Sequence, residues 1–452
     1  MNARTVFGLA ATAALAAASA RADVPAVTKV NVTAEGPSVV VTYELTDAPA
    51  IVTLNVETNN GAGGWASIGG GNIRNFAPES AVFRRVEGTG PHTITWHSDL
   101  SWPGHRLAAG DVRLKLAAWP VDAPPDYMVV DLSATAATNS QAYYPSEDYL
   151  PGGLMGNPDY RTSKLVMRRM HAKDVTWSMG STNIPSSYDP GGKHWNIVRA
   201  MSRHNVKLPS DYFIGVFPVT QSQWALVVGS AKGTYANEAF KAMRPVDTTT
   251  YNDIRNYGNG YADYNWPNDP YKNSFLGKIR PKTGIDFELP TDAQWEFACR
   301  AGTGDNVWND GTPFGDVTVD ANLPGRYKWN GGYIDGTTEP PAGCTDEHAT
   351  AAVGSYGRNA WGLYDMHGNV REWCLDYYDE TYTPANGIVN IDPKDGSKKA
   401  NGTDGGSRVV RGGSFGDDAF NCRPAYREGA TPSYGNKLCG FRVACPIGLV
   451  NP

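Results

Sequence analysis

Leu289-Pro-Thr-Asp-Ala-Gln-Trp-Glu-Phe-Ala-Cys-Arg-Ala-Gly302 is the stretch of this 452-residue chain that most clearly encodes its own local structure. Thr291 and Gln294 have the spacing of a capping box, in which each side chain bonds the backbone N–H of the other residue. The stretch therefore predicts a helix from Asp292 to Ala301, ended by Gly302. An apolar stripe at i, i+3, i+4 and i+7 is predicted to be buried, which favours a structural cysteine. Its members are Trp295, Ala298, Cys299 and Gly302.

A second capping box, Thr220-x-x-Gln223, opens the helical stretch Ser222-Gln-Trp-Ala-Leu-Val-Val228 upstream. Other periodic stretches are scarce in this part of the chain. The sequence holds 50 glycines and 31 prolines, together with 13 Trp and 23 Tyr. Because glycine and proline favour turns, we expect many turns held by aromatic packing and little regular secondary structure.

The N-terminal part has a different pattern, in which short runs alternate apolar and polar residues between Gly, Pro and Asp signals. Such alternation predicts strands with one buried face. About seven runs lie between Val27 and Leu132, which favours a β-sandwich similar to immunoglobulin or fibronectin type III modules. We interpret it as a spacer or docking module. The clearest runs are Val39-Val-Val-Thr-Tyr43, Ile51-Val-Thr-Leu54, Thr93-Ile-Thr-Trp96 and Val112-Arg-Leu-Lys-Leu116.

Residues 1–22 have the pattern of a secretory signal peptide: Arg4, an apolar run from Val6 to Ala18, and a small-x-small site before Asp23. An uncleaved N-terminal anchor is the alternative. No later run approaches 18 apolar residues, so no membrane span is expected after signal cleavage. The mature protein is expected to be extracytoplasmic, in a periplasm or secreted. Its net charge of -6 and the lack of a basic run argue against nucleic-acid partners.

The predicted organisation is thus a signal peptide (1–22), a β-sandwich (23–132), a linker (133–162) and a second domain (163–452). The linker is assigned because its Ser/Ala/Thr and Tyr/Pro/Gly-rich sequence has neither the helical nor the strand period. An even number of cysteines in an exported chain favours disulfides, although six cysteines allow fifteen pairings. The cysteines are Cys299, Cys344, Cys374, Cys422, Cys439 and Cys445.

Four phrases of the second domain together resemble the formylglycine-generating enzyme, or sulfatase-modifying factor, family. They are Leu289 to Gly302, Gly362-Leu-Tyr-Asp-Met-His-Gly-Asn-Val-Arg-Glu-Trp373, Arg408-Val-Val-Arg-Gly-Gly-Ser-Phe415 and Gly440-Phe-Arg442. Weaker similarities extend the resemblance over residues 163–446. The resemblance implies a mixed α/β fold related to C-type lectins. The expected fold class of the whole chain is therefore α+β, with an all-β domain first.

The segment Asp365-Met-His-Gly-Asn-Val-Arg-Glu372 places two carboxylates around a glycine, and calcium prefers oxygen ligands. The resemblance implies a calcium site here, and a turn capped by carboxylates is the alternative. His367 is expected to be structural, because calcium does not favour imidazole. The implied ligands are Asp365, the carbonyls of Gly368 and Val370, and Glu372. A second calcium site would use Asn322, Leu323, Asp346 and His348.

The resemblance also implies a reactive centre, because oxygen-dependent members carry two cysteines at the third and eighth positions after the Gly-Gly-Ser serine. These thiolates hold copper(I), which activates oxygen to convert a substrate cysteine to formylglycine. Here the serine is Ser414, the third position is Asp417 and the eighth is Cys422. A carboxylate is a hard ligand, so one thiolate is expected to hold copper(I) far less well than a pair.

Two alternatives remain for Cys422. A gap in the alignment would mean that it does not correspond to the family's copper cysteine, and a disulfide with Cys374 or Cys439 is also possible. The family also places a disulfide partner for the helix cysteine near Cys445, from which we predict a Cys299–Cys445 disulfide. Gly412-Gly-Ser-Phe-Gly416 matches G-x-S-x-G, but a hydrolase triad would need a later histidine, and none follows His367.

Two functions are therefore predicted. The first is an exported formylglycine-generating oxidase acting on a Cys or Ser of a protein or peptide substrate such as a sulfatase, with Ser414, Cys422 and Asp417 lining the site. The second is a non-catalytic, lectin-like module that recognises protein, peptide or glycan. Other oxidative chemistry, as in exported relatives that mature peptide natural products, is a third possibility.

Overall fold

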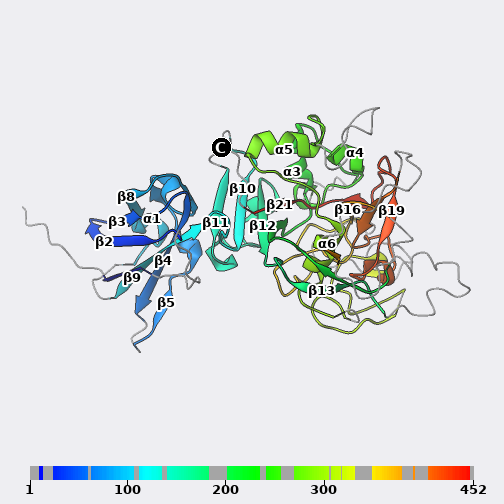
Figure 1. The fold of residues 1–452 in the computed structure, drawn as a ribbon, viewed down its shortest axis with the longest axis horizontal. Coiled ribbons are helices and arrows are strands. Elements are labelled where there is room, and N and C mark those ends of the chain that lie inside the picture. The colour runs from blue at the N-terminus through cyan, green and yellow to red at the C-terminus, as the bar shows by residue number, and fades with distance from the viewer. Residues whose placement is uncertain are drawn as a thin grey trace, which may run out of the picture. The chain divides into compact units, whose positions relative to one another are not determined.

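The fold is a mixed α+β structure made mostly of strands, seen here in a computed structural model (Figure 1). Within the described residues no helix is long and apolar enough to cross a membrane. Two compact units divide the chain: residues 1–130 with 139–160, and residues 131–138 with 161–452. The structure describes residues 10–13, 24–59, 63–105, 111–134, 140–182, 201–234, 241–255, 269–304, 307–316, 318–330, 349–378, 390–391 and 406–447.

The first unit contains two sheets with strand orders β1-β9-β4-β5, where β7 also pairs with β4, and β2-β3-β8-β6. All four quoted runs lie in strands of these sheets, as predicted. Their inward residues, such as Val41 and Leu114, join one hydrophobic core. The elements are β1 (Ala10–Ala13), β2 (Val27–Glu35), β3 (Ser38–Leu45), β4 (Ala50–Asn59), β5 (Trp65–Ser67), β6 (Phe76–Ala77), β7 (Arg84–Val86), β8 (Gly90–His97), α1 (Ser98–Ser101) and β9 (Val112–Pro120).

The segment predicted to be an irregular linker carries regular structure. Strand β11 (Gln141–Tyr144) pairs antiparallel with β10 (Tyr127–Asp131), and the 3-10 helices η4 (Glu147–Tyr149) and η5 (Pro158–Arg161) follow. Three consecutive β11 residues, from Gln141 to Tyr143, are buried. A strand covered on both faces has no polar alternation, which explains why the period-two pattern missed it.

The second unit combines short sheets with a few helices. Its sheets include β12-β15-β21, β13-β14-β17 and β19-β18-β16-β20. Helices α3 and α5 lie side by side (Figure 1), where Trp224 stacks on Phe275 with ring centres 5.3 Å apart. The helices are α3 (Gln221–Val228), α4 (Tyr251–Ile254), α5 (Phe275–Thr283) and α6 (Asp292–Arg300). The strands are β12 (Lys164–Met170), β13 (Thr176–Met179), β14 (His204–Lys207), β15 (Tyr212–Gly215), β16 (Arg371–Tyr377), β17 (Asn390–Ile391), β18 (Arg408–Arg411), β19 (Glu428–Ala430), β20 (Cys439–Gly440) and β21 (Ala444–Pro446).

Both predicted capping boxes are confirmed, with Thr220 and Gln223 opening α3 and Thr291 and Gln294 opening α6. The predicted stripe of α6 faces the interior, and Trp295 and Cys299 are fully buried. The helix ends one residue earlier than predicted, because Ala301, before Gly302, takes the left-handed cap conformation with φ 48°.

The predicted Cys299–Cys445 disulfide is not formed. Cys299 on α6 lies with its Sγ 3.8 Å from the carbonyl oxygen of Met366, whereas Cys445 on β21 lines a separate cavity. The two sulfurs therefore have different surroundings, which a match of sequence positions did not reveal. The described cysteines are all free and buried, so the suggested pairings of Cys422 with Cys374 or Cys439 are also not formed. Cys344 lies outside the described residues.

Candidate functional site

Two loops that carry most of the predicted site residues lie against each other. Strands β16 and β18 pair antiparallel, with Glu372 opposite Arg411, so the loops before β16 and after β18 meet. The backbone N–H of Gly368 donates to the carbonyl of Gly412 at 2.7 Å, and that of Phe415 donates to Asn369 at 3.0 Å. We call residues 365–372 and 412–422 the paired loops.

The glycine pair before Ser414 lets the second loop fold back on itself. Gly413 has φ 65°, and a Cβ added there would lie 2.7 Å from the Sγ atom of Cys422. Any larger residue would therefore collide with the sulfur. This contact explains why Gly-Gly-Ser, eight residues before Cys422, brings the serine and the cysteine into one site.

Asp417, which stands where the resemblance implies a copper thiolate, is held by protein groups. The Ser414 hydroxyl donates to its Oδ2 atom at 2.6 Å. The Arg371 guanidinium donates Nε to Oδ2 at 2.8 Å and Nη2 to Oδ1 at 2.5 Å. This bidentate, charge-assisted geometry engages both oxygens of the carboxylate.

Arg371 also forms an ion pair with Glu428 on β19, with 3.0 Å between Nη1 and Oε2. Burial by itself would lower the pKa of Arg371, but the hydrogen bonds and charge of Asp417, followed by the charge of Glu428, raise it. The guanidinium is therefore a permanent cation that contacts the second of the paired loops through Asp417.

Cys422 ends the second loop in an apolar environment. It is fully buried and packs in a cluster with Trp308, Leu323, Tyr327 and Ala419. Burial, and then the charge of Asp417, raise the pKa of its thiol well above the ordinary value. Because only the thiolate is a good nucleophile or soft-metal ligand, this raised pKa disfavours reaction of Cys422 at neutral pH.

Copper(I) does not fit this arrangement. The pair of sulfurs that would suit a soft ion is replaced by one protonated thiol and one carboxylate that a guanidinium already engages. Within the described ranges, no group of three or more His, Cys, Asp and Glu side chains is placed to hold a metal.

The first predicted calcium site is also occupied by protein contacts. Both Glu372 oxygens accept hydrogen bonds from Arg442, Nε to Oε2 at 2.6 Å and Nη2 to Oε1 at 2.7 Å. Trp295 on α6 donates its indole N–H to Oε2 at 2.7 Å. The arginine also donates to the carbonyl of Asp365, at 3.4 Å. Both Glu372 oxygens and the Asp365 carbonyl therefore accept hydrogen bonds from one guanidinium.

Asp365 is fully buried, and its carboxylate accepts from the Gly354 N–H at 2.7 Å and from the Asn369 amide at 3.2 Å. Burial raises its pKa to about 6. Gly368 sits at φ 82°, and a Cβ there would lie 2.0 Å from the carbonyl oxygen of Arg326. Together with the Arg442 contacts, these bonds give the carboxylate oxygens of Asp365 and Glu372 protein partners. Calcium ligation by Asp365, Gly368, Val370 and Glu372 stays a prediction.

His367 links the paired loops, since its Nδ1–H donates to the carbonyl of Cys422 at 2.8 Å. Burial lowers its pKa to about 4, so the ring is neutral near pH 7. Of the second predicted calcium site, Leu323 packs beside Cys422, and the Asn322 N–H bonds Asp320 at 2.9 Å. Asp346 and His348 lie outside the described residues.

Reasoning from the sequence missed the two arginines that organise the site. Arg371 is next to Glu372 in the quoted phrase, and Arg442 ends Gly440-Phe-Arg442, yet neither received a role. One signal in the sequence was Asp417 itself. A carboxylate at a position where a buried thiol is expected needs a cation beside it, and this predicts a nearby arginine or lysine.

The second unit matches a known family. The profile of the Sulfatase-modifying factor enzyme 1-like domain matches residues 169–447. "Chaperone protein LppX" from Paenibacillus barcinonensis is 30% identical over 217 residues, which are 43% of this chain and 72% of that protein. "Formylglycine-generating enzyme" from Streptomyces coelicolor is 35% identical over 172 residues, which are 36% of this chain and 48% of that enzyme. The chain thus spans about half the length of that enzyme.

Solved structures similar to this chain include "Treponema denticola variable protein 1", at 23% identity and a TM-score of 0.42 over 63% of this chain and 95% of that one. "Structure of PvdO from Pseudomonas aeruginosa" is similar at 21% identity and a TM-score of 0.42, over 62% of this chain and 94% of that one.

Proposed function

This chain belongs to the sulfatase-modifying factor enzyme family, and on that premise we propose that it is a non-oxidising member whose family domain recognises a protein or peptide. The observation that carries the proposal is the replacement of a copper thiolate by Asp417. Its carboxylate accepts hydrogen bonds from Arg371 and Ser414, so the Arg371–Asp417 ion pair holds the paired loops together.

The state of Cys422 supports the same conclusion. A catalytic thiolate needs solvent access or a stabilising cation, and this thiol is fully buried with a raised pKa. The nearest carboxylate raises that pKa further instead of lowering it. The second of the paired loops therefore has a structural role, and its one buried, protonated thiol does not supply the chemistry of a redox centre.

A protein or peptide partner agrees with the names of the relatives. One is named a chaperone protein and another a formylglycine-generating enzyme. A sulfatase-type segment is accordingly the first probe to use. We further propose that the protein acts in an extracytoplasmic compartment, and that the first unit is an immunoglobulin- or fibronectin-like sandwich that positions the family domain.

The experiment that tests the proposal uses the purified full chain, copper(I), oxygen and a labelled Cys-x-Pro-x-Arg peptide. We expect the peptide to keep its mass, and to bind with the same affinity, by fluorescence anisotropy, with and without copper. Aldehyde formation, seen by mass spectrometry and lost in Cys422→Ala, would overturn the proposal. Failure of the peptide to bind at all would remove its recognition part.

Restoring the thiol pair provides the sharper control. Asp417→Cys places a second sulfur at the third position after Ser414, and we expect it to gain one tightly held copper(I) that is lost again when Cys422→Ala is added. Asp418→Cys is the matched control, because Asp418 is the adjacent carboxylate and bonds Trp329 and Lys328 instead of Arg371. Equal copper binding by the wild type and Asp417→Cys would show that Asp417 is not what prevents copper binding.

A further inference from the structure

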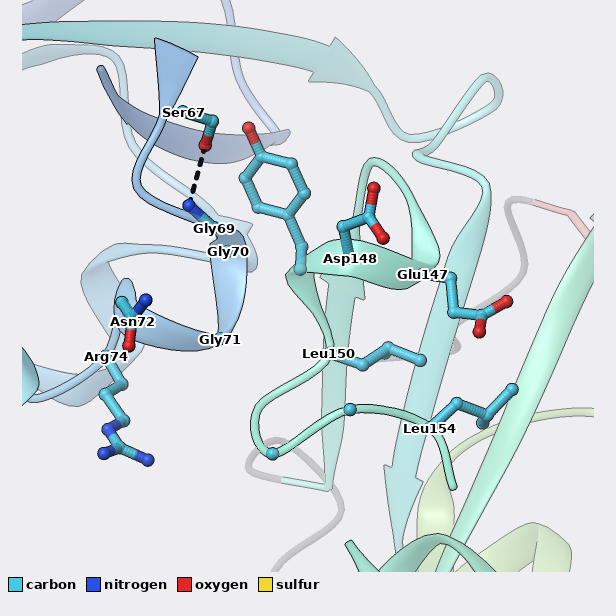
Figure 2. Close-up of a pocket in the computed structure, with 13 residues that line it drawn as sticks. Ser67, Gly69, Gly70, Gly71, Asn72, Arg74, Glu147, Asp148, Leu150 and Leu154 are labelled. Atoms are coloured by element: carbon cyan, nitrogen blue, oxygen red, sulfur yellow. Dashed lines mark hydrogen bonds between the residues drawn. The ribbon is translucent and has the colours of Figure 1, made fainter. Parts of the chain in front are cut away.

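A polar cleft lies within the first unit and belongs to neither of the predicted sites. Its volume is about 670 Å³, within the range of roughly 300–1,000 Å³ that small-molecule sites occupy. Figure 2 shows its two walls: the glycine turn Gly69–Gly71, with Asn72 and Arg74 beyond it, and the segment from Glu147 to Leu154.

Glycines shape this cleft by exposing main chain on both walls. A Cβ at Gly70 would lie 2.2 Å from the Cα of Tyr149, so the walls touch there because this residue has no side chain. A Cβ at Gly71 would face the opposite wall, 3.7 Å from the backbone nitrogen of Gly152 and from the carbonyl oxygen of Leu150. A side chain at position 71 would therefore project across the cleft.

Two buried leucines and one aromatic ring line part of the cleft. Leu150 and Leu154 are almost fully buried. The Tyr149 ring lines the cleft and packs edge-on against Phe83, with ring centres 6.2 Å apart. Its hydroxyl is hydrogen-bonded to Ser67, and burial raises its pKa. The ring is thus fixed in place before any ligand arrives.

Polar groups at the rim have spare hydrogen-bonding capacity. In the described part of the chain, the Arg74 guanidinium and the Asp148 carboxylate have no hydrogen-bond or ion-pair partner. The Asn72 amide nitrogen donates to the Ile68 carbonyl at 2.6 Å, which leaves the amide oxygen as an acceptor. Figure 2 shows Arg74 and Asp148 extending from opposite walls. The cleft therefore offers donors and acceptors together.

From this chemistry we infer that the cleft binds a neutral saccharide of about two rings. A hydroxyl both donates and accepts, so a hydroxyl-rich ligand uses guanidinium, carboxylate and amide groups at once. The apolar face of a sugar ring packs on an aromatic side chain, and the glycines let the ligand approach the main chain. Two carboxylates, Glu147 and Asp148, against one guanidinium disfavour phosphates and other anions.

The test is isothermal titration calorimetry of the full chain with maltose, cellobiose, lactose and N,N′-diacetylchitobiose, and with glucose 6-phosphate as the charged comparison. We expect at least one disaccharide to bind and the phosphate to bind more weakly. Gly71→Leu should weaken binding by about tenfold or more, because its side chain fills the cleft. The matched control is Gly88→Leu, at an exposed glycine with no atom within 4 Å of its added Cβ, which should bind as the wild type does.

Asp148→Asn and Arg74→Gln are two further variants that should not disturb folding, because both side chains are exposed. Each should weaken disaccharide binding several-fold while the melting temperature stays unchanged. The inference is wrong if none of the four disaccharides binds, if Gly71→Leu binds as tightly as Gly88→Leu, or if glucose 6-phosphate binds most tightly. Because the site lies in the first unit, these results do not depend on the copper experiments.

Discussion

Replacing Arg371 by methionine is the perturbation that most directly tests how the paired loops are held. The substitution keeps an apolar stem but removes the guanidinium that bonds both oxygens of Asp417 and one oxygen of Glu428. Asp417 then keeps the hydrogen bond from the Ser414 hydroxyl, and its side chain is only 10% exposed.

The magnitude follows from this burial. Removing one partner of a buried ion pair costs about 3–5 kcal/mol, because the other charge is left uncompensated. The Arg371 side chain is 15% exposed, so we take the lower end, about 3 kcal/mol. For a unit of this size, a loss of that free energy lowers the melting temperature by about 6–12 °C.

The assay is thermal unfolding followed by near-ultraviolet circular dichroism, which reports the tertiary packing of the tryptophans. Lys207→Met is the matched control, because it breaks the exposed Lys207–Asp174 pair and should leave the melting temperature almost unchanged. A double-mutant cycle of Arg371→Met with Asp417→Asn should give a coupling of about 2 kcal/mol or more. If Arg371→Met costs no more than the control and shows no coupling, Asp417 is not held by Arg371 and the argument against a metal ligand there fails.

Three further predictions concern the same unit. Adding calcium or a chelator should shift the melting temperature by less than about 2 °C, since Arg442 and Trp295 already engage both Glu372 oxygens; a rise of many degrees with calcium would mean that the ligands rearrange. Burial would raise the pKa values of Asp292 and Glu296, but the charge of Arg411 lowers that of Asp292, and the charges of Arg300 and then Arg411 lower that of Glu296. The folded state therefore binds fewer protons at these two groups than the unfolded state near and below pH 4. Above about pH 5 the raised pKa of Asp365 and the lowered pKa of His367 act in opposite directions. The contribution of Asp292 and Glu296 to the free energy of unfolding should be steady there and fall as the pH drops further, and a free energy that is flat down to pH 3 would contradict these shifts. Thr291→Ala removes the α6 cap and should cost about 1 kcal/mol in urea unfolding, whereas an unchanged midpoint would mean that the cap adds nothing.

Local patterns predicted some elements well because their interactions are local. The capping boxes at Thr220 and Thr291 join residues three positions apart, so the sequence contains the whole interaction. Strand β11 was missed because its buried faces remove the alternation on which the prediction relied. The Cys299–Cys445 pairing failed because it rested on matched sequence positions and not on the surroundings of the two sulfurs.

The sequence by itself determined the family, and it placed Asp417 at the position where the family resemblance implies a copper thiolate. Only the tertiary structure decided which cations lie beside these carboxylates, since Arg371 is 46 positions away from Asp417, and Arg442 is 70 positions away from Glu372. No local period records contacts over such separations. They arise when strands β16, β18 and β20 pair and bring their loops together, and burial then requires each carboxylate there to have a cation beside it.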